Sequence, residues 1–77
     1  MKARIFVTLK DGVLDPQGQA IQGALGALGF DGVASVKQGK MFDIELTDSA
    51  DAEARLKAMC EKLLANTVIE DFRVEIT

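Results

Sequence analysis

The chain contains no histidine, no tryptophan and no tyrosine, and it has one cysteine among its 77 residues. Histidine is the commonest general base and metal ligand, and a lone cysteine provides neither a disulfide framework nor a cluster of soft metal ligands. A self-contained hydrolase or metalloenzyme is therefore not expected. No apolar run is long enough to cross a bilayer, and residues 5–9 are too few for the core of a signal peptide. These absences predict a soluble, cytoplasmic protein with no membrane partner.

An excess of basic residues is also lacking, since nine lysines and arginines face twelve aspartates and glutamates, for a net charge of −3. Binding to nucleic-acid phosphates requires a concentrated positive charge, so no nucleic-acid partner is expected. The basic residues are interleaved with acidic ones, as Arg73 is with Glu75. Such interleaving is typical of an ordinary solvated exterior.

The length predicts one domain that spans residues 1–77. A domain of this size buries only about 60% of the surface that its unfolded chain exposes, which is close to the lower limit of independent stability. Self-association would relieve this deficit, so a homo-oligomer is expected.

The first half of the chain predicts a strand, a helix and a weaker strand. Apolar and other residues alternate over 3–9, which is the pattern of a strand with one face on the core. Residues 16–28 carry Ile21, Leu25 and Leu28 at helical spacing, and Gly29 is predicted to end this helix in the left-handed conformation. Residues 33–37 form the weaker strand, and Gln38-Gly39 is predicted as a tight hairpin turn whose glycine has a positive φ.

The second half repeats the order of strand, helix and strand. Phe42, Ile44 and Leu46 alternate with polar residues in the return strand, and Asp48 or Ser49 is predicted to cap the next helix. The apolar stripe of that helix comprises Ala52, Leu56, Met59, Cys60 and Leu63. Asn66 is predicted as a left-handed terminator, and residues 72–76 form the last strand. The order βαββαβ predicts an α+β fold, a ferredoxin-like two-layer sandwich with an antiparallel sheet and both helices on one face.

The loop before the first helix combines a helix start with exposed apolar residues. Asp15 is expected to be the N-cap that accepts from Gln17 or Gly18, and Pro16 occupies the first helical position. Val13 and Leu14 precede the cap, and packing under the helix end explains one of them at most. Contact with a partner protein would explain why both residues are apolar. The other face of the sheet, which would carry Phe6 and Met41, is a second candidate association surface.

No motif for catalysis or phosphate binding is found. Cys60 lies on the apolar stripe of the second helix and is expected to be a core residue rather than a nucleophile. The first strand is followed by Lys10-Asp11-Gly12 and not by the Cys-x-x-Cys of a copper carrier. The glycines at 23, 26, 29 and 32 lie within and after a helix, whereas phosphate-binding motifs place glycines before one.

Two other functions share this topology. An RNA-recognition motif would stack bases on Phe6 and Phe42, but alternation places Phe42 on the inner face and the charge balance is acidic. A small-molecule-binding regulatory module remains open, with the helix start at Asp15-Pro16 as its obvious anion site. Binding of amino acids, nucleotides or RNA by the purified protein would separate these alternatives.

Three segments resemble the PurS family, the small subunit of the three-part phosphoribosylformylglycinamidine synthase of bacterial and archaeal purine synthesis. They are VTLKDGVLDPQG over residues 7–18, the stretch from Leu28-Gly29-Phe30 to Gly39-Lys40, and CEKLLANTVIEDF over residues 60–72. Their spacing fits over essentially the full length. The sequence departs from the family at Thr67, where the family usually has proline.

The resemblance implies a non-catalytic structural subunit that joins a glutaminase subunit to an ATP-dependent synthetase subunit, so that ammonia passes between them without escaping. No activity of the chain alone and no cofactor in this chain are expected. ATP and magnesium would belong to the synthetase subunit, and no catalytic or metal-binding residue is assigned here.

The candidate site residues fall into two groups. The candidate partner-binding residues are Lys10, Val13, Leu14, Lys37, Lys40, Lys62, Glu70 and Asp71. The motif residues with a structural explanation are Gly12, Asp15, Pro16, Gly18, Gly29, Gly39 and Asn66.

Overall fold

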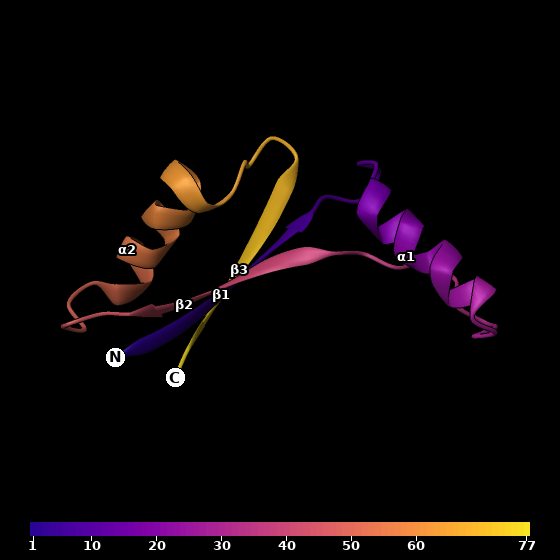
Figure 1. Ribbon diagram of the computed structural model, residues 1–77. Helices are drawn as coiled ribbons and strands as arrows, with labels where there is room; N and C mark the ends of the chain where they lie inside the picture. Colours follow the sequence, from indigo (N-terminus) through magenta and orange to yellow (C-terminus); the bar gives the residue numbers. More distant parts are fainter.

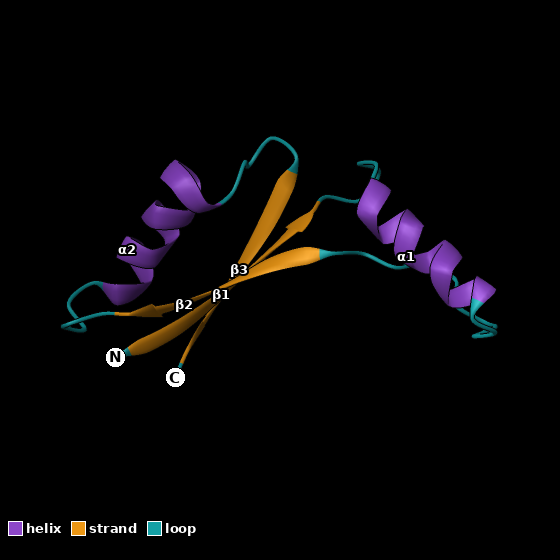
Figure 2. Cartoon of the chain, in the orientation of Figure 1, coloured by secondary structure: helices purple, strands orange, loops and turns teal.

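The sheet is built around the first strand. In the computed structural model, which describes residues 1–77, strand β1 (Lys2–Leu9) lies between β2 (Gly39–Glu45) and β3 (Glu70–Ile76) and pairs antiparallel with both. Its partners at Ile5 are Phe42 on one side and Val74 on the other, so apolar residues of all three strands share one face. The fold is of the predicted α+β class, with an antiparallel sheet and two helices (Figure 2).

Helix α2 (Ala52–Met59) covers the inner face of the sheet and continues into a π-helical turn, η1 (Cys60–Leu64). Ile5 and Val7 of β1 and Leu56 and Cys60 of the helical segment are almost completely buried. Only nine of the 77 residues are buried, so the core is small. The flanking residues Phe42, Ile44, Phe72 and Val74 are only partly covered.

Helix α1 (Pro16–Ala27) projects from the sheet as an arm and does not cover it (Figure 1). The molecule measures 49 × 25 × 14 Å with a Cα radius of gyration of 15.7 Å. A compact chain of this length has a radius of gyration of about 11.5 Å. The prediction that both helices lie on one face is therefore wrong within a single chain, because only α2 packs on the sheet.

The predicted strand over residues 33–37 does not form. This segment returns along α1 instead, where the side-chain amide of Gln22 donates to the carbonyls of Val33 and Ala34 at 3.4 and 3.1 Å. The predicted hairpin turn is also wrong, because Gly39 has no positive φ and is the first residue of β2. A Cβ at Gly39 would lie 2.6 Å from the Val7 carbonyl oxygen, so glycine is needed there for close approach of the strands.

The second helix departs from prediction at both ends. Its N-cap is Asp51, at φ 48°, and the predicted Asp48 accepts from the N–H of Ala50 instead. The π turn, in which the N–H of Ala65 donates to the Cys60 carbonyl at 2.9 Å, shifts the apolar stripe by one residue. The predicted core residue Leu63 is consequently 83% exposed, and Ala65 is buried in the core.

The end of α1 follows the prediction. Gly29 has φ +91°, the N–H of Gly29 donates to the Gly26 carbonyl, and the N–H of Phe30 donates to the Leu25 carbonyl. This pair of bonds is a Schellman motif, which requires a left-handed residue at the position of Gly29. Neither helix has the length and apolar character needed for a membrane span.

Candidate functional site: the arm and the charged end of the sheet

The arm comprises α1 and residues 28–38, and it joins the sheet through a neck of residues 10–15 and 36–38. Asp15 lies at this neck and confirms the predicted N-cap, since its Oδ1 accepts from the N–H of Gly18 at 2.9 Å. Its Oδ2 accepts from the N–H of Gln38, also at 2.9 Å. The pKa of Asp15 lies below its ordinary value because the Gln38 and Gly18 N–H groups both donate to the carboxylate.

Further contacts hold the two sides of the neck together. The Lys37 ammonium lies 2.7 Å from Asp11 Oδ1 and lowers the pKa of Asp11 through its hydrogen bond and its charge. Gly18 is buried, and a Cβ there would lie 2.3 Å from the Val36 carbonyl oxygen. Gly12 has φ +85° in the outgoing segment. The candidate partner residue Lys37 is thus already paired within its own chain.

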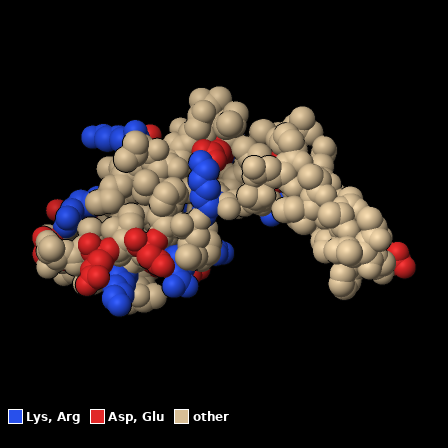
Figure 3. Space-filling model, viewed as in Figure 1, with Lys and Arg blue, Asp and Glu red and all other residues tan.

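The surface of the arm carries no charge from Pro16 to Phe30. Ile21 is 41% exposed, Leu28 73% and Phe30 59%. Figure 3 shows the difference plainly, because lysine, arginine and acidic side chains gather over the sheet and α2 while the arm is almost free of them. Helix α1 thus projects as an uncharged surface that packs on neither the sheet nor α2.

Four of the candidate partner residues meet at the end of the sheet nearest the neck. The Lys10 ammonium lies 3.8 Å from Asp71 Oδ1, and the Lys40 ammonium lies 3.8 Å from Glu70 Oε2. The N–H of Lys10 also donates to the Ile69 carbonyl at 2.8 Å. We call Lys10, Lys40, Glu70 and Asp71 the charged end. Its two ion pairs join residues that are 61 and 30 positions apart in the sequence, which periodicity alone does not reveal.

The loop before β3 is held by Asn66, and not through the predicted left-handed conformation. Its side-chain Oδ1 accepts from the N–H of Val68 at 3.2 Å, and its backbone N–H donates to Glu70 Oε1 at 2.7 Å. Asp51 is the non-glycine residue with a positive φ, so Asn66 does not end the helix as predicted. The loop presents Val68, which is 81% exposed, beside the charged end.

The remaining candidate residues lie apart from the charged end. Leu14 is 65% exposed and Val13 is partly exposed, and both line a depression at the root of the arm. Lys62 lies beyond α2 and borders a groove of about 460 Å³. The apolar residues of that groove are Ile44, Ala58, Met59, Leu63 and Leu64. Sequence reasoning missed this groove, because the π turn that exposes Leu63 leaves no mark in the apolar spacing.

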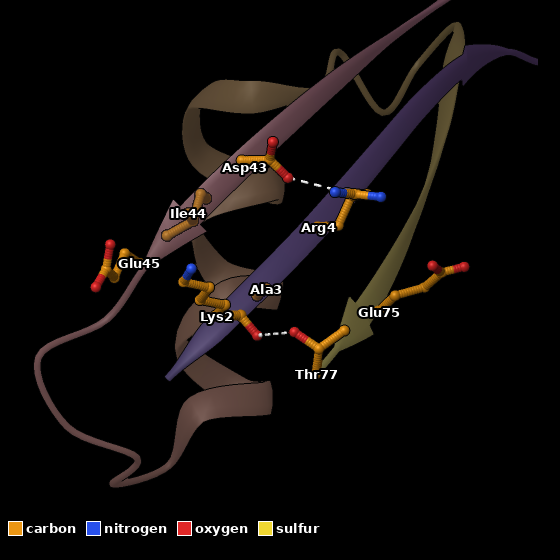
Figure 4. Close-up of a pocket in the computed structure, with 8 residues that line it drawn as sticks. All are labelled: Lys2, Ala3, Arg4, Asp43, Ile44, Glu45, Glu75 and Thr77. Atoms are coloured by element: carbon orange, nitrogen blue, oxygen red, sulfur yellow. Dashed lines mark hydrogen bonds and ion pairs between the residues drawn. The ribbon is translucent and has the colours of Figure 1, made fainter.

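Several charged side chains on the outer face of the sheet are paired with one another. A depression of about 360 Å³ there is lined mainly by charged residues of the three strands (Figure 4). Arg4 Nε lies 2.9 Å from Asp43 Oδ1, and the Arg73 guanidinium lies 3.3 Å from Glu75. Arg73 also covers the ring of Phe6 at 4.6 Å, which shields the apolar residue predicted on this face.

The single cysteine has the properties of a core residue. Cys60 is fully buried in the core, as predicted, and burial raises the pKa of its thiol. A thiol in that state is a poor nucleophile. No group of three or more cysteine, aspartate or glutamate side chains is arranged to hold a metal ion. The class that this fold and surface define is a small α+β association module with an exposed apolar arm.

Comparison with known proteins identifies the family. Residues 2–77 match the family model PurS, described as phosphoribosylformylglycinamidine (FGAM) synthase. Phosphoribosylformylglycinamidine synthase subunit PurS of Mycobacterium leprae is 51% identical over 73 residues, which are 95% of this chain and 91% of that protein. The Bacillus subtilis subunit of the same name is 47% identical over 76 residues, or 97% of this chain and 90% of that protein.

Solved structures agree with this match. A crystal form of Bacillus subtilis PurS superimposes with a TM-score of 0.87 at 48% identity, and covers 96% of this chain and 94% of its own. A chain of the PurLQS structure from Thermotoga maritima gives a TM-score of 0.80 at 30% identity, and covers 96% and 93%. The chain belongs to the PurS family of phosphoribosylformylglycinamidine synthase subunits of purine biosynthesis.

Proposed function

We propose that this chain is the non-catalytic structural subunit of a phosphoribosylformylglycinamidine synthase and bridges its glutaminase and ATP-dependent synthetase subunits for transfer of ammonia. The observation that carries the proposal is the full-length match to PurS, one relative of which is part of a solved PurLQS structure. The uncharged arm and the charged end supply two separate surfaces for such a role. ATP, magnesium and the nucleotide substrate would be bound by the synthetase subunit. A cytoplasmic location follows from this role.

Reconstitution from purified proteins tests the bridging role. The three subunits are mixed with glutamine, ATP, magnesium and formylglycinamide ribonucleotide, and each is omitted in turn. We expect glutamine-dependent synthesis only in the complete mixture. Activity that persists without this chain would contradict the proposal. A parallel assay with free ammonia in place of glutamine shows whether omission impairs the synthetase itself or the supply of ammonia.

We also propose that the arm packs on a second copy of the chain. An isolated helix of about 12 residues is marginal in water, and each of the internal glycines 23 and 26 costs about 1 kcal/mol relative to alanine. Helix α1 therefore needs packing that its own sheet does not provide. The inner face of the sheet is incompletely covered, since Ile76 is 37% exposed and Phe72 and Val74 are partly exposed. The arm of a second copy would bury its own apolar residues and those on the incompletely covered inner face of the sheet.

Multi-angle light scattering on the purified chain measures this association. The wild type is expected to be a dimer or tetramer, and Ile21→Glu is expected to shift it towards the monomer by placing a charge on the apolar side of the arm. Gln19→Glu is the matched control, because it adds the same charge at an exposed position about 200° away around the helix. A monomeric wild type, or equal dissociation of the two variants, would contradict arm packing.

A further inference from the structure

The direction of the arm depends on contacts in the neck. Every covalent connection between α1 and the sheet passes through residues 10–15 or through residues 36–38, and neither segment belongs to a strand or a helix. The outgoing segment contains Gly12 at φ +85°, a conformation that few other residues adopt. Two such connections form a hinge unless side-chain or backbone contacts fix the angle.

Asp15 provides such a contact beyond its role as a cap. An N-cap requires one oxygen acceptor, and serine, asparagine and aspartate serve about equally well. Aspartate has a second oxygen, and here that oxygen accepts from the backbone N–H of Gln38, 23 positions away in the sequence. One carboxylate thus joins the first turn of α1 to the residue that precedes β2.

The surrounding backbone restricts the geometry of the hydrogen bond between the Gln38 N–H and Asp15 Oδ2. Gly18, which donates to Asp15 Oδ1, lies so close to the return segment that a Cβ would be 2.3 Å from the Val36 carbonyl and 2.7 Å from Asp15 Oδ2. The next residue of the return segment, Lys37, is tied to Asp11 of the outgoing segment at 2.7 Å. The Asp11 pair is exposed and so contributes little by itself. The carboxylate of Asp15 is the contact that links both segments to the helix.

We propose that Asp15 is the positioning residue of the arm: its second oxygen, bound to the Gln38 N–H, fixes the angle between α1 and the sheet and thereby presents the arm to a second copy. The part of this inference that concerns a second copy rests on the association proposed above. A chain whose arm samples many angles binds more weakly in proportion to the fraction of time that it spends at the right angle.

Two substitutions separate the positioning role from the cap. Asp15→Ser and Asp15→Asn each keep one oxygen acceptor for Gly18 at the helix start and remove the second carboxylate oxygen, which accepts from Gln38. Asp48→Asn is the matched control, because Asp48 is also an exposed carboxylate in a loop before a helix, and its Oδ1 accepts from the N–H of Ala50 and from the Arg55 guanidinium. Circular dichroism verifies that each variant keeps its helix content.

The angle is measured by electron paramagnetic resonance on spin labels at Ala27→Cys in the arm and Ala54→Cys in α2, both exposed sites. Labelled chain is diluted into excess unlabelled chain so that only distances within one chain are recorded. Buried Cys60 remains unlabelled, which the parent chain without added cysteines verifies. We expect one narrow distance distribution for the wild type and the Asp48 control, and a distribution about twofold broader for both Asp15 variants.

Association is then measured on the same variants by light scattering over a range of concentrations. A fall of the correctly oriented fraction to about one tenth in each copy raises the dissociation constant of a dimer with two exchanged arms about a hundredfold, because both arms must be oriented. Unchanged distance distributions in the Asp15 variants would overturn the positioning role, whatever the oligomeric state. Broadened distributions with an unchanged dissociation constant would overturn the link to the second copy. A wild type that shows one narrow distance as a monomer would support the positioning role and refute arm packing.

Discussion

At the scale of single residues, conformation is set in some positions by immediate neighbours and in others by distant segments of the chain. Asp15, Pro16 and Gly29 follow from capping rules that involve their immediate neighbours. The bond from Gln38 to Asp15 joins positions that no periodicity connects. Gly39 was correctly predicted to be a structural residue, but the predicted reason was wrong. The glycine permits close approach of its strand to Val7 and does not form a turn.

Acidification is expected to weaken the neck. The folded state holds the pKa of Asp15 and of Asp11 below the ordinary value, so it binds fewer protons than the unfolded chain does. Their contribution to stability is complete above the ordinary pKa of about 3.9 and is lost as the pH falls through the lowered value. Thermal unfolding between about pH 5 and pH 3 should show a steeper loss of Tm in the wild type than in Asp15→Ser. Parallel curves would mean that Asp15 contributes nothing to this dependence.

Two glycine substitutions should change the free energy of unfolding in opposite directions. Gly39→Ala places a Cβ 2.6 Å from the Val7 carbonyl oxygen, and separating the strands to admit it should cost about 1–3 kcal/mol. Gly23→Ala has no atom within 4 Å of the added Cβ and lies inside α1, so it should stabilise by up to about 1 kcal/mol. Denaturant unfolding curves measure both. A Gly39→Ala protein as stable as the wild type would disprove the close approach.

At the scale of elements, periodicity located β1, β2, β3 and both helices, and it failed where the backbone left regular geometry. Residues 33–37 were predicted as a strand, but their hydrogen-bond partner is Gln22 of α1 and not a neighbouring strand. The π turn of η1 displaced the stripe of α2 at its end. Neither outcome has a signature in the spacing of apolar residues, because both depend on which segment the chain meets in three dimensions.

The π turn makes two adjacent leucines unequal. Leu64 is partly buried and packs against the core, whereas Leu63 is 83% exposed. Leu64→Ala should therefore destabilise the protein by about 1–2 kcal/mol, and Leu63→Ala should change its stability by less than about 0.5 kcal/mol. Urea unfolding of both variants gives the comparison. The reverse order would show that the helix continues in α geometry past Met59.

At the scale of the whole molecule, the family and the α+β class were predictable from the sequence, and the open shape was not. The core of eight buried apolar residues lies between the sheet and α2, and α1 stands outside it. Strand and helix order cannot distinguish a helix that covers its own sheet from one that leaves it. That distinction is set by the neck, through residues such as Gly18 and Asp15.

Charge reversal tests which surfaces meet the other subunits. Lys40 belongs to the charged end and Lys62 borders the apolar groove, so Lys40→Glu with Lys62→Glu should weaken complex assembly and leave the fold intact. Lys2→Glu, on the outer face of the sheet, is the control for each single reversal, since every Lys→Glu change alters the net charge by the same amount. Co-elution with the glutaminase and synthetase subunits is the measurement, and circular dichroism checks the fold. Unaltered co-elution of the double variant would exclude both surfaces.

Because few residues are buried, the abundance of this protein depends on how much of it is bound to other chains. With nine buried positions, a solitary copy has little to offset the entropy that it loses on folding, and contacts from other chains contribute a large share of its stability. Its melting temperature then rises with its concentration, and copies made in excess of their partners are the first to be unfolded and degraded. Proteolytic turnover can in this way keep the abundance of the chain matched to that of the assembly it joins.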